Sequence, residues 1–302
     1  MMYRKRILLV LVALLGLLTA CGQATNAFGE IANKPEAEAQ PTTGQAGGVQ
    51  PIVATSELVV GHNRMALGLI ENNVPIPDAA QTRVHVRFFK LKGDQGTLVG
   101  EEDARYYGEG LGARGTFITH PTFDAPGEWG LEVQMTRPGK PTSTQRLGLE
   151  VVQKGSAVPI GAQAPRSKTP TASEVKDLRT ITSASKPDPR LYRLSVDQAV
   201  TSGKPSMILF ATPGFCQTTV CGPGVDVLGR LANKFGDKVN AVHVEVYQYP
   251  FDPLKTVKTM DEWGLKSEPW LFLVDKTGHI VARFEGGITY PEIEPEVAKL
   301  VQ

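Results

Sequence analysis

Two cysteines near the middle of the C-terminal half have the residue type and spacing for thiol chemistry. Cys216 and Cys221 are separated by four residues, and they follow an apolar run at 207–210 and a Pro-Gly turn. In thiol–disulfide exchange a thiolate attacks a disulfide, and a second thiol nearby can resolve the resulting mixed disulfide. The pair can therefore carry redox chemistry, and the competing interpretation is a static structural disulfide.

The elements around the pair predict how the two sulfurs are positioned. Residues 206–210 read as a buried strand, and the residues after Pro223 have the spacing of an amphipathic helix over 223–235. The apolar positions of that helix are Val225, Leu228, Leu231, Ala232 and Phe235. A helix N-terminus favours thiolate over thiol. Residues five apart on a helix point about 140° away from each other, so the sulfurs can meet only if Cys216 lies in the loop before the helix.

The third cysteine belongs to a targeting segment. The basic residues 4–6, the apolar run 7–18 and the tetrapeptide Leu-Thr-Ala-Cys ending at Cys21 resemble a bacterial lipoprotein signal. The apolar run is shorter than the roughly 20 residues needed to span a bilayer. The resemblance implies cleavage before Cys21, lipid on its sulfur, and an extracytoplasmic protein anchored to a membrane.

That location favours a Cys216–Cys221 disulfide, because disulfides persist outside the cytoplasm. Closing so short a loop contributes only about 2 kcal/mol, and a stabilising disulfide would more usefully join distant segments, so redox chemistry is favoured. The formal net charge of +1 gives no basic face, and no nucleic-acid partner is expected.

Composition divides the rest of the chain. Residues 22–50 are poor in large apolar side chains and predict a flexible tether after the signal segment 1–21. Residues 51–154 show period-two apolar runs between turn residues, which predicts an all-β sandwich. The runs are 58–60, 65–70, 84–89, 98–107, 115–119, 129–135 and 147–152. The stretch 69–79 followed by 84–87 resembles the start of bacterial immunoglobulin-like modules.

Residues 155–190 are rich in Pro, Ser and Thr and predict a linker, part of which can pack on the domain after it. In 191–302, strands alternate with helices and end in a hairpin over 270–285, which predicts an α/β fold with parallel pairing and an antiparallel edge. One of the helices is expected over about 253–263.

The segment 191–302 resembles the thioredoxin fold. The resemblance rests on the cysteine loop at the first strand–helix junction and on the stretch 264–286, which matches the family's cis-proline, hairpin and final strand. It implies that Pro269 is a cis-proline facing the thiols, and that the backbone before it pairs with a bound substrate chain. By the same resemblance Phe215 and Glu268 contact substrate.

The resemblance leaves the identity of the nucleophile open. Phe215-Cys216 can take the place of the family's aromatic-Cys, which makes Cys216 the attacking thiol and Cys221 the resolving one. Alternatively, Cys221-Gly-Pro can take the position of the family's Cys-Gly-Pro, and the helix dipole favours Cys221 as the more acidic thiol. The distance from the preceding strand favours Cys216.

Three features depart from the family pattern. The cysteines are spaced C-x4-C instead of C-x-x-C. The carboxylate of Glu268 is expected to raise the thiol pKa by like-charge repulsion. The strand before the cysteines lacks the buried acid that many thioredoxins use in proton transfer, and Glu245 on the neighbouring strand is the candidate substitute.

The leading hypothesis is an extracytoplasmic, membrane-anchored thiol–disulfide oxidoreductase whose partner is an extracytoplasmic protein with a disulfide or dithiol. It needs no cofactor and no resident metal. The first alternative is a copper-binding protein similar to Sco-type chaperones, in which His243 or His279 would join the cysteines. The second is a non-catalytic adaptor with a static disulfide. The scattered His62, His85 and His120 lack ligand spacing and predict no metal site.

Overall fold

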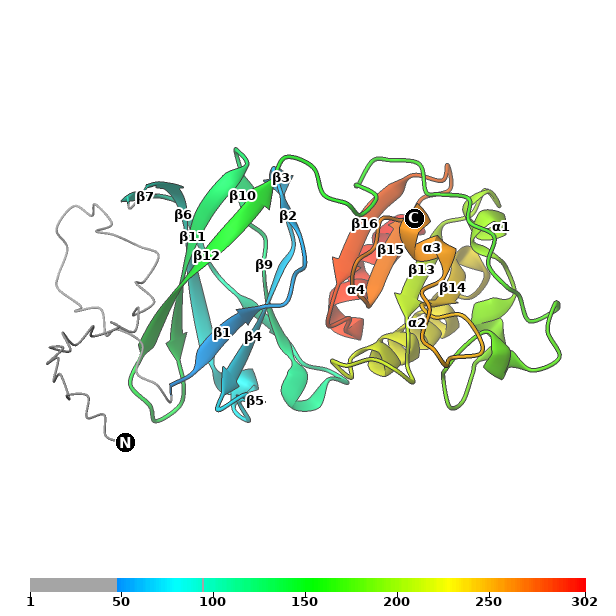
Figure 1. Ribbon diagram of the computed structural model, residues 1–302, viewed down its shortest axis with the longest axis horizontal. Helices are drawn as coiled ribbons and strands as arrows, with labels where there is room; N and C mark the ends of the chain where they lie inside the picture. Colours follow the sequence, from blue (N-terminus) through cyan, green and yellow to red (C-terminus); the bar gives the residue numbers. More distant parts are fainter. Residues whose placement is uncertain (1–47, 94) are drawn as a thin grey trace, which may run out of the picture.

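The computed structural model describes residues 48–93 and 95–302. The predicted signal segment, Cys21 and most of the tether lie outside the described residues. The described chain forms two lobes along the long axis of the molecule, a β lobe of residues 48–154 and an α/β lobe of residues 155–302 (Figure 1). No helix in these residues has the length and apolar character to cross a membrane.

The β lobe contains two larger sheets and a short two-stranded one. The first sheet has the order β1-β4-β9-β8 with β5 paired to β4, the second has the order β2-β12-β11-β6-β7, and β10 pairs with β3. The strands are β1 (Gln50–Val53), β2 (Leu58–Val59), β3 (Gly61–His62), β4 (Met65–Glu71), β5 (Val74–Pro75), β6 (Arg83–Lys92), β7 (Gln95–Asp103), β8 (Arg105–Tyr107), β9 (Thr116–Thr119), β10 (Thr122–Phe123), β11 (Gly127–Thr136) and β12 (Ser143–Val152).

Alternating side chains of the two larger sheets form one shared apolar core. In β6, Val84, Val86 and Phe88 are buried at every second position, as the period of a strand requires. They share one cluster with residues of the other sheet, including Met65 and Leu67 of β4. The region is therefore a pair of sheets packed around a single core.

One predicted strand of the β lobe is wrong. The expected strand 98–107 is two strands, β7 in the second sheet and β8 in the first. The chain passes between the sheets at Ala104, whose N–H donates to the carbonyl of Val84. Only Ala104 separates the two strands, so no loop in the sequence marks the crossing.

The α/β lobe has a four-stranded sheet with the order β14-β13-β15-β16. The parallel pair β13–β14 and the antiparallel hairpin pair β15–β16 were predicted, and β13 also pairs antiparallel with β15. The strands are β13 (Ser206–Ala211), β14 (Asn240–Glu245), β15 (Trp270–Val274) and β16 (Ile280–Glu285), and the helices are α1 (Val196–Val200), α2 (Cys221–Phe235), α3 (Lys258–Glu262) and α4 (Tyr290–Leu300). Short 3-10 helices lie at Ala79–Gln81, Gly112–Arg114, Leu178–Thr180, Pro189–Tyr192 and Gly236–Lys238.

This sheet is covered on both faces. Residues of α2 and α4 pack with one apolar cluster, which includes Leu228 and Ile293, and residues of α1 and α3 pack with the other, which includes Val196 and Met260. The helix predicted over 253–263 is shorter than expected, since α3 begins only at Lys258. Two prolines and an isolated bridge between Tyr247 and Thr256 hold the preceding residues as a loop.

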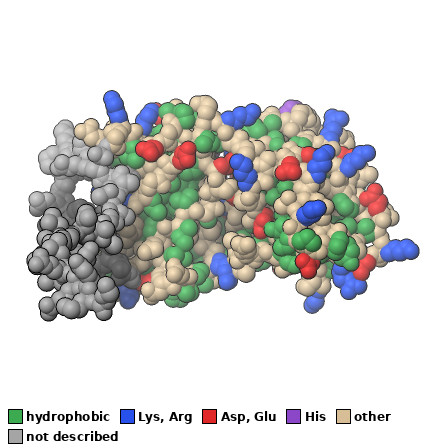
Figure 2. All heavy atoms as spheres, in the orientation of Figure 1, with side chains coloured by type: hydrophobic (Ala, Val, Ile, Leu, Met, Phe, Trp, Pro, Cys, Tyr) green, Lys and Arg blue, Asp and Glu red, His purple; other side chains and the backbone are tan. Residues whose placement is uncertain are grey.

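Residues 155–190 lie along the α/β lobe. The N–H groups of Val158, Gly161 and Ala164 donate to carbonyls of that lobe, and Ser167, Thr169 and Thr182 are buried. Short polar side chains of this kind satisfy buried backbone groups, which is how a segment with the composition of a linker can pack. On the face shown in Figure 2, acidic and basic side chains are interspersed over both lobes.

Candidate thiol–disulfide site

The cysteine loop joins a buried strand to a helix. All residues of β13 are buried, which fixes the start of the loop. Helix α2 begins at Cys221, two residues before the predicted start at Pro223. Pro223 fits in the first turn of the helix because an N–H group there would have no intrahelical carbonyl to donate to, so the proline loses no hydrogen bond. The first helical hydrogen bond runs from Gly224 N–H to the Val220 carbonyl.

Cys216 and Cys221 form a disulfide, with 6.0 Å between their Cα atoms. Cys216 lies in the loop before the helix, as its spacing from Cys221 requires, and is partly exposed. Cys221 is fully buried at the start of α2. The two thiols therefore differ in access to a partner, and only Cys216 can meet one without rearrangement.

Polar groups surround the sulfur of Cys216. The backbone N–H of Cys221 donates to Sγ of Cys216 at 3.4 Å, and Oγ1 of Thr218 lies 3.3 Å from the same sulfur. An N–H group at a helix N-terminus stabilises negative charge. The arrangement therefore favours thiolate at Cys216, although Cys221 is the residue within the helix.

Pro269 and Glu268 lie beside the sulfurs. The Glu268–Pro269 peptide bond is cis, as the resemblance implies, and the Pro269 carbonyl accepts the N–H of Gly286 at 3.0 Å. A carboxylate oxygen of Glu268 and the two sulfurs lie within 4.8 Å of one another. Burial, followed by the nearby charge of Glu245, raises the pKa of Glu268.

Glu245 is buried, and the sequence did not show whether it would be. Its carboxylate accepts hydrogen bonds from the backbone and the hydroxyl of Ser183, both at 2.7 Å. The Ser183 hydroxyl accepts the N–H of Gly214 at 2.9 Å. Glu245 thus anchors the start of the cysteine loop through Ser183, a residue that the sequence placed in a linker and gave no sign of being near the site.

Phe215 belongs to an aromatic patch formed by Phe215, Tyr247, Tyr249 and Phe251. Its ring centroid lies 5.2 Å from that of Phe251 and 6.2 Å from that of Tyr247, and Phe251 in turn contacts Tyr249. Phe215 is 36% exposed and Tyr249 is 59% exposed. These large, partly exposed aromatic side chains form an apolar surface directly beside Cys216.

Neither histidine proposed as a copper ligand belongs to the donor group around the sulfurs. His243 is buried, with Nδ1 2.6 Å from the Tyr192 hydroxyl and Nε2 3.0 Å from the Ala211 carbonyl. Burial lowers the pKa of His243. His279 lies in the hairpin beside Thr277 and Gln163. Among the described residues, the donor set of two cysteines and a histidine is not assembled.

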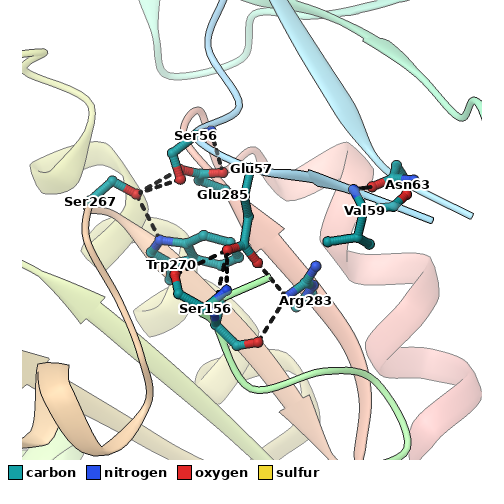
Figure 3. Close-up of polar contacts among 10 residues, drawn as sticks. Ser56, Glu57, Val59, Asn63, Ser156, Ser267, Trp270, Arg283 and Glu285 are labelled. Carbon is teal, nitrogen blue, oxygen red and sulfur yellow. Dashed lines mark hydrogen bonds and ion pairs between the residues drawn. The ribbon is translucent and has the colours of Figure 1, made fainter. Parts of the chain in front are cut away.

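The β lobe contacts the α/β lobe near Ser267 and Trp270, which flank Glu268 and Pro269 in the sequence (Figure 3). Glu285 accepts from the backbone N–H of Ser56 at 2.9 Å and from the hydroxyl of Ser267 at 2.6 Å, and Ser267 also accepts from the Trp270 indole at 2.9 Å. Glu57 accepts from Ser156 N–H at 2.7 Å and from Arg283 at 3.0 Å. The loop that carries Pro269 is therefore held partly by the β lobe.

A cleft of about 480 Å³ lies between the lobes at this point. Its floor on the α/β lobe includes Thr218, Val220 and Glu268, and its opposite wall includes Ile52 and Leu69 of the β lobe. The cleft therefore reaches from the cysteine loop and Glu268 to an apolar wall supplied by the other lobe.

The strand order β14-β13-β15-β16, the cysteine pair between β13 and α2, and a cis-proline before β15 define a thioredoxin-like domain. No protein-family profile and no curated protein sequence matches this chain.

Solved structures that resemble it include a thiol:disulfide interchange protein of the thioredoxin family from Chlorobium tepidum, at 14% identity and a TM-score of 0.30, covering 47% of this chain and 100% of that chain. A DsbF homologue from Corynebacterium diphtheriae is 18% identical with a TM-score of 0.29, covering 35% of this chain and 77% of its own. The pneumococcal exposed lipoprotein thioredoxin from Streptococcus pneumoniae is 17% identical with a TM-score of 0.28, covering 33% and 87%. Similarities of this size carry no argument about function, which has to come from the site.

Proposed function

We propose that this protein is an extracytoplasmic thiol–disulfide oxidoreductase that is anchored to a membrane. One observation carries the proposal: a partly exposed Cys216 and a buried Cys221 are paired at a strand–helix junction, within 4.8 Å of the carboxylate of Glu268, the residue before the cis-proline Pro269. A disulfide serving only stability gains nothing from an accessible sulfur, whereas exchange requires one.

The reaction proceeds through a mixed disulfide. The Cys216 thiolate attacks one sulfur of the partner's disulfide, the partner's S–S bond breaks, and its released sulfur leaves as a thiolate that takes a proton from solvent. Cys221 then attacks Sγ of Cys216 as a thiolate, which breaks the mixed disulfide and releases the second partner thiol. The partner gains two electrons and the Cys216–Cys221 pair loses two, and the reverse sequence oxidises a partner dithiol.

The partner is an extracytoplasmic protein with a disulfide or dithiol, bound on either side of Cys216. On one side the aromatic patch presents Phe215 and Tyr249. On the other side the cleft presents Glu268 and the backbone before Pro269. Both surfaces border the accessible thiol, which supports Phe215 and Glu268 as substrate contacts.

Anchoring rests on the N-terminal sequence. Lipid on Cys21 would tether the protein to the outer face of a membrane through residues 22–50, and the β lobe, which we propose to be an immunoglobulin-like module, would stand between the membrane and the thiol site. Mass spectrometry of the protein extracted from membranes tests this, since the mature chain is expected to begin at Cys21 and to carry the added mass of lipid on that residue. An unmodified Cys21, or an N-terminus elsewhere, would contradict lipid anchoring.

The redox function is tested by the reduction potential of the Cys216–Cys221 pair. The full chain with Cys21→Ser is equilibrated in glutathione buffers, and the free thiols are counted by mass spectrometry. A potential between about −120 and −270 mV, the span of exchange catalysts, is expected. A potential below about −300 mV would identify an inert structural disulfide and would favour the adaptor function instead.

A further inference from the structure

Two sulfurs and one carboxylate form the only group of three or more Cys, His, Asp or Glu donors that converge at metal-binding distance in residues 48–93 and 95–302. The donor atoms of Cys216, Cys221 and Glu268 lie within 4.8 Å of one another. We propose that the reduced pair together with Glu268 forms a binding site for a divalent zinc ion. This proposal stands apart from the exchange function, because it concerns the reduced protein without a partner.

The environment of Glu268 is the first reason. The other partly or fully buried carboxylates around the site all have donors: Glu245 has Ser183, Glu285 has Ser56 and Ser267, and Glu57 has Arg283. Within the described chain, no hydrogen-bond donor or cation contacts the carboxylate of Glu268, which instead approaches two sulfurs. A partly buried carboxylate without a partner costs free energy, which a bound cation would offset.

The geometry of the pair is the second reason. In a tetrahedral zinc site with Zn–S distances of about 2.3 Å and a Zn–O distance of about 2.1 Å, the sulfurs lie about 3.8 Å apart and each sulfur lies about 3.6 Å from the oxygen. Breaking the disulfide lets the sulfurs separate, and the Cα atoms are already 6.0 Å apart. The site needs only side-chain rotation of Cys216, which lies in a loop and is partly exposed.

The donor set selects the ion. Two thiolates and one carboxylate suit zinc, with water in the fourth position, whereas copper(I) prefers soft sulfur ligands and gains little from a carboxylate. On binding, each thiol releases its proton to solvent and the metal occupies the two sulfurs that exchange requires. Zinc loading and disulfide exchange are therefore mutually exclusive states of one cysteine pair.

The test uses the reduced full chain with Cys21→Ser, so that only the pair supplies thiols. Cobalt(II) serves as the spectroscopic probe, and zinc(II) is then added to displace it. One equivalent of cobalt is expected to give thiolate-to-metal charge-transfer absorption with visible bands of four-coordinate cobalt. Glu268→Gln is expected to weaken zinc binding by at least about tenfold. Glu128→Gln, a change at an exposed carboxylate of β11, should leave zinc binding unchanged.

Two results would overturn the proposal. Absence of the charge-transfer band in the reduced protein would exclude a site at the pair. Equal zinc affinity of the Glu268→Gln and Glu268→Asp variants and the unsubstituted protein would show that the carboxylate is no ligand. Circular dichroism of each variant shows whether the fold is kept. The reduction potential of the cysteine pair in each variant shows whether the exchange function is kept, so loss of the metal site alone can be recognised.

Discussion

Arg64 of the β lobe and Glu292 of α4 form a bidentate ion pair in which the side chains are only 9% and 7% exposed. The guanidinium also donates to the carbonyls of Glu285 and Gly287, at 2.7 and 3.3 Å. Every nitrogen of this guanidinium therefore contacts the α/β lobe, close to the strand that completes the hairpin after the cis-proline. Removing one member of such a pair leaves the other charge buried without its partner.

Replacing Glu292 with Gln is expected to lower the free energy of unfolding by about 3 kcal/mol, because Arg64 stays buried and loses its counter-charge. Glu109→Gln is the matched control, since Glu109 pairs with Arg230 across the same two lobes but both side chains are almost half exposed. That change is expected to cost less than about 1 kcal/mol. Urea unfolding measures both, and equal losses would show that the Arg64–Glu292 pair does not depend on its burial.

The two cysteines should differ in reactivity. When the reduced Cys221→Ser variant is mixed with glutathione disulfide, it is expected to hold a stable mixed disulfide at Cys216. The Cys216→Ser variant should form its adduct at least about tenfold more slowly, because Cys221 is fully buried. Quenched mass spectrometry gives both rates. A faster adduct at Cys221 would make it the nucleophile, the assignment that its position in the helix favours.

Burial of His243 predicts a pH dependence of stability. Desolvation holds the pKa of this imidazole below its usual range, so the unfolded chain takes up a proton that the folded chain does not. The stabilisation is fully present above the unfolded pKa of about 6.5 and is lost as the pH falls below it, with a slope of up to about 1.4 kcal/mol per pH unit.

Unfolding titrations between pH 7.5 and pH 5.5 measure this slope. His243→Gln should remove its contribution. Tyr192→Phe deletes the hydroxyl that contacts Nδ1 but keeps the ring, so it should lower stability at every pH while leaving the slope in place, because desolvation is the main cause of the shift. An unchanged slope in His243→Gln would mean that another group controls the acid sensitivity.

Gly264 tests the packing of residues 155–190 against the α/β lobe. It has φ +65°, and a Cβ atom built there would lie 1.9 Å from the carbonyl oxygen of Ser156. Gly203 has φ +75° with nothing within 4 Å, so Gly203→Ala measures the backbone term alone, about 1–2 kcal/mol. Gly264→Ala is expected to cost about 1–3 kcal/mol more, as overpacking does. If thermal or urea unfolding showed equal losses of unfolding free energy for the two variants, residues 155–190 would move away from the added Cβ atom at no cost.

Local patterns predicted the parts of the site that are close in sequence. The apolar run before Cys216 and the helical spacing after Pro223 indicated the strand and the helix, because each depends on a few neighbouring residues. The cis-proline at 269 was implied by the resemblance to the thioredoxin fold and not by a local pattern. The parallel pair β13–β14 and the hairpin pair β15–β16 were confirmed, since alternating strands and helices leave few ways to pair, whereas the antiparallel pairing of β13 with β15 was not predicted.

Contacts between distant residues could not be predicted. Ser183 approaches Glu245 from 62 positions away, and Ser56 reaches Glu285 from 229 positions away. Neither contact leaves a periodicity or a motif, since each joins a single polar residue to a single carboxylate. The early start of α2 and the division of 98–107 into two strands were missed because apolar spacing marks which face is buried and not where an element begins or ends.

The carboxylates at the boundary between the lobes have a reciprocal arrangement. Glu57 of the β lobe is satisfied by Arg283 and Ser156, while Glu285 and Glu292 of the α/β lobe are satisfied by Ser56 and Arg64. Each half thus supplies charges that the other neutralises. Recombination that moved either half into another gene would deliver uncompensated acids to its new neighbour, so we expect the two halves to be inherited together, with these residues changing in step.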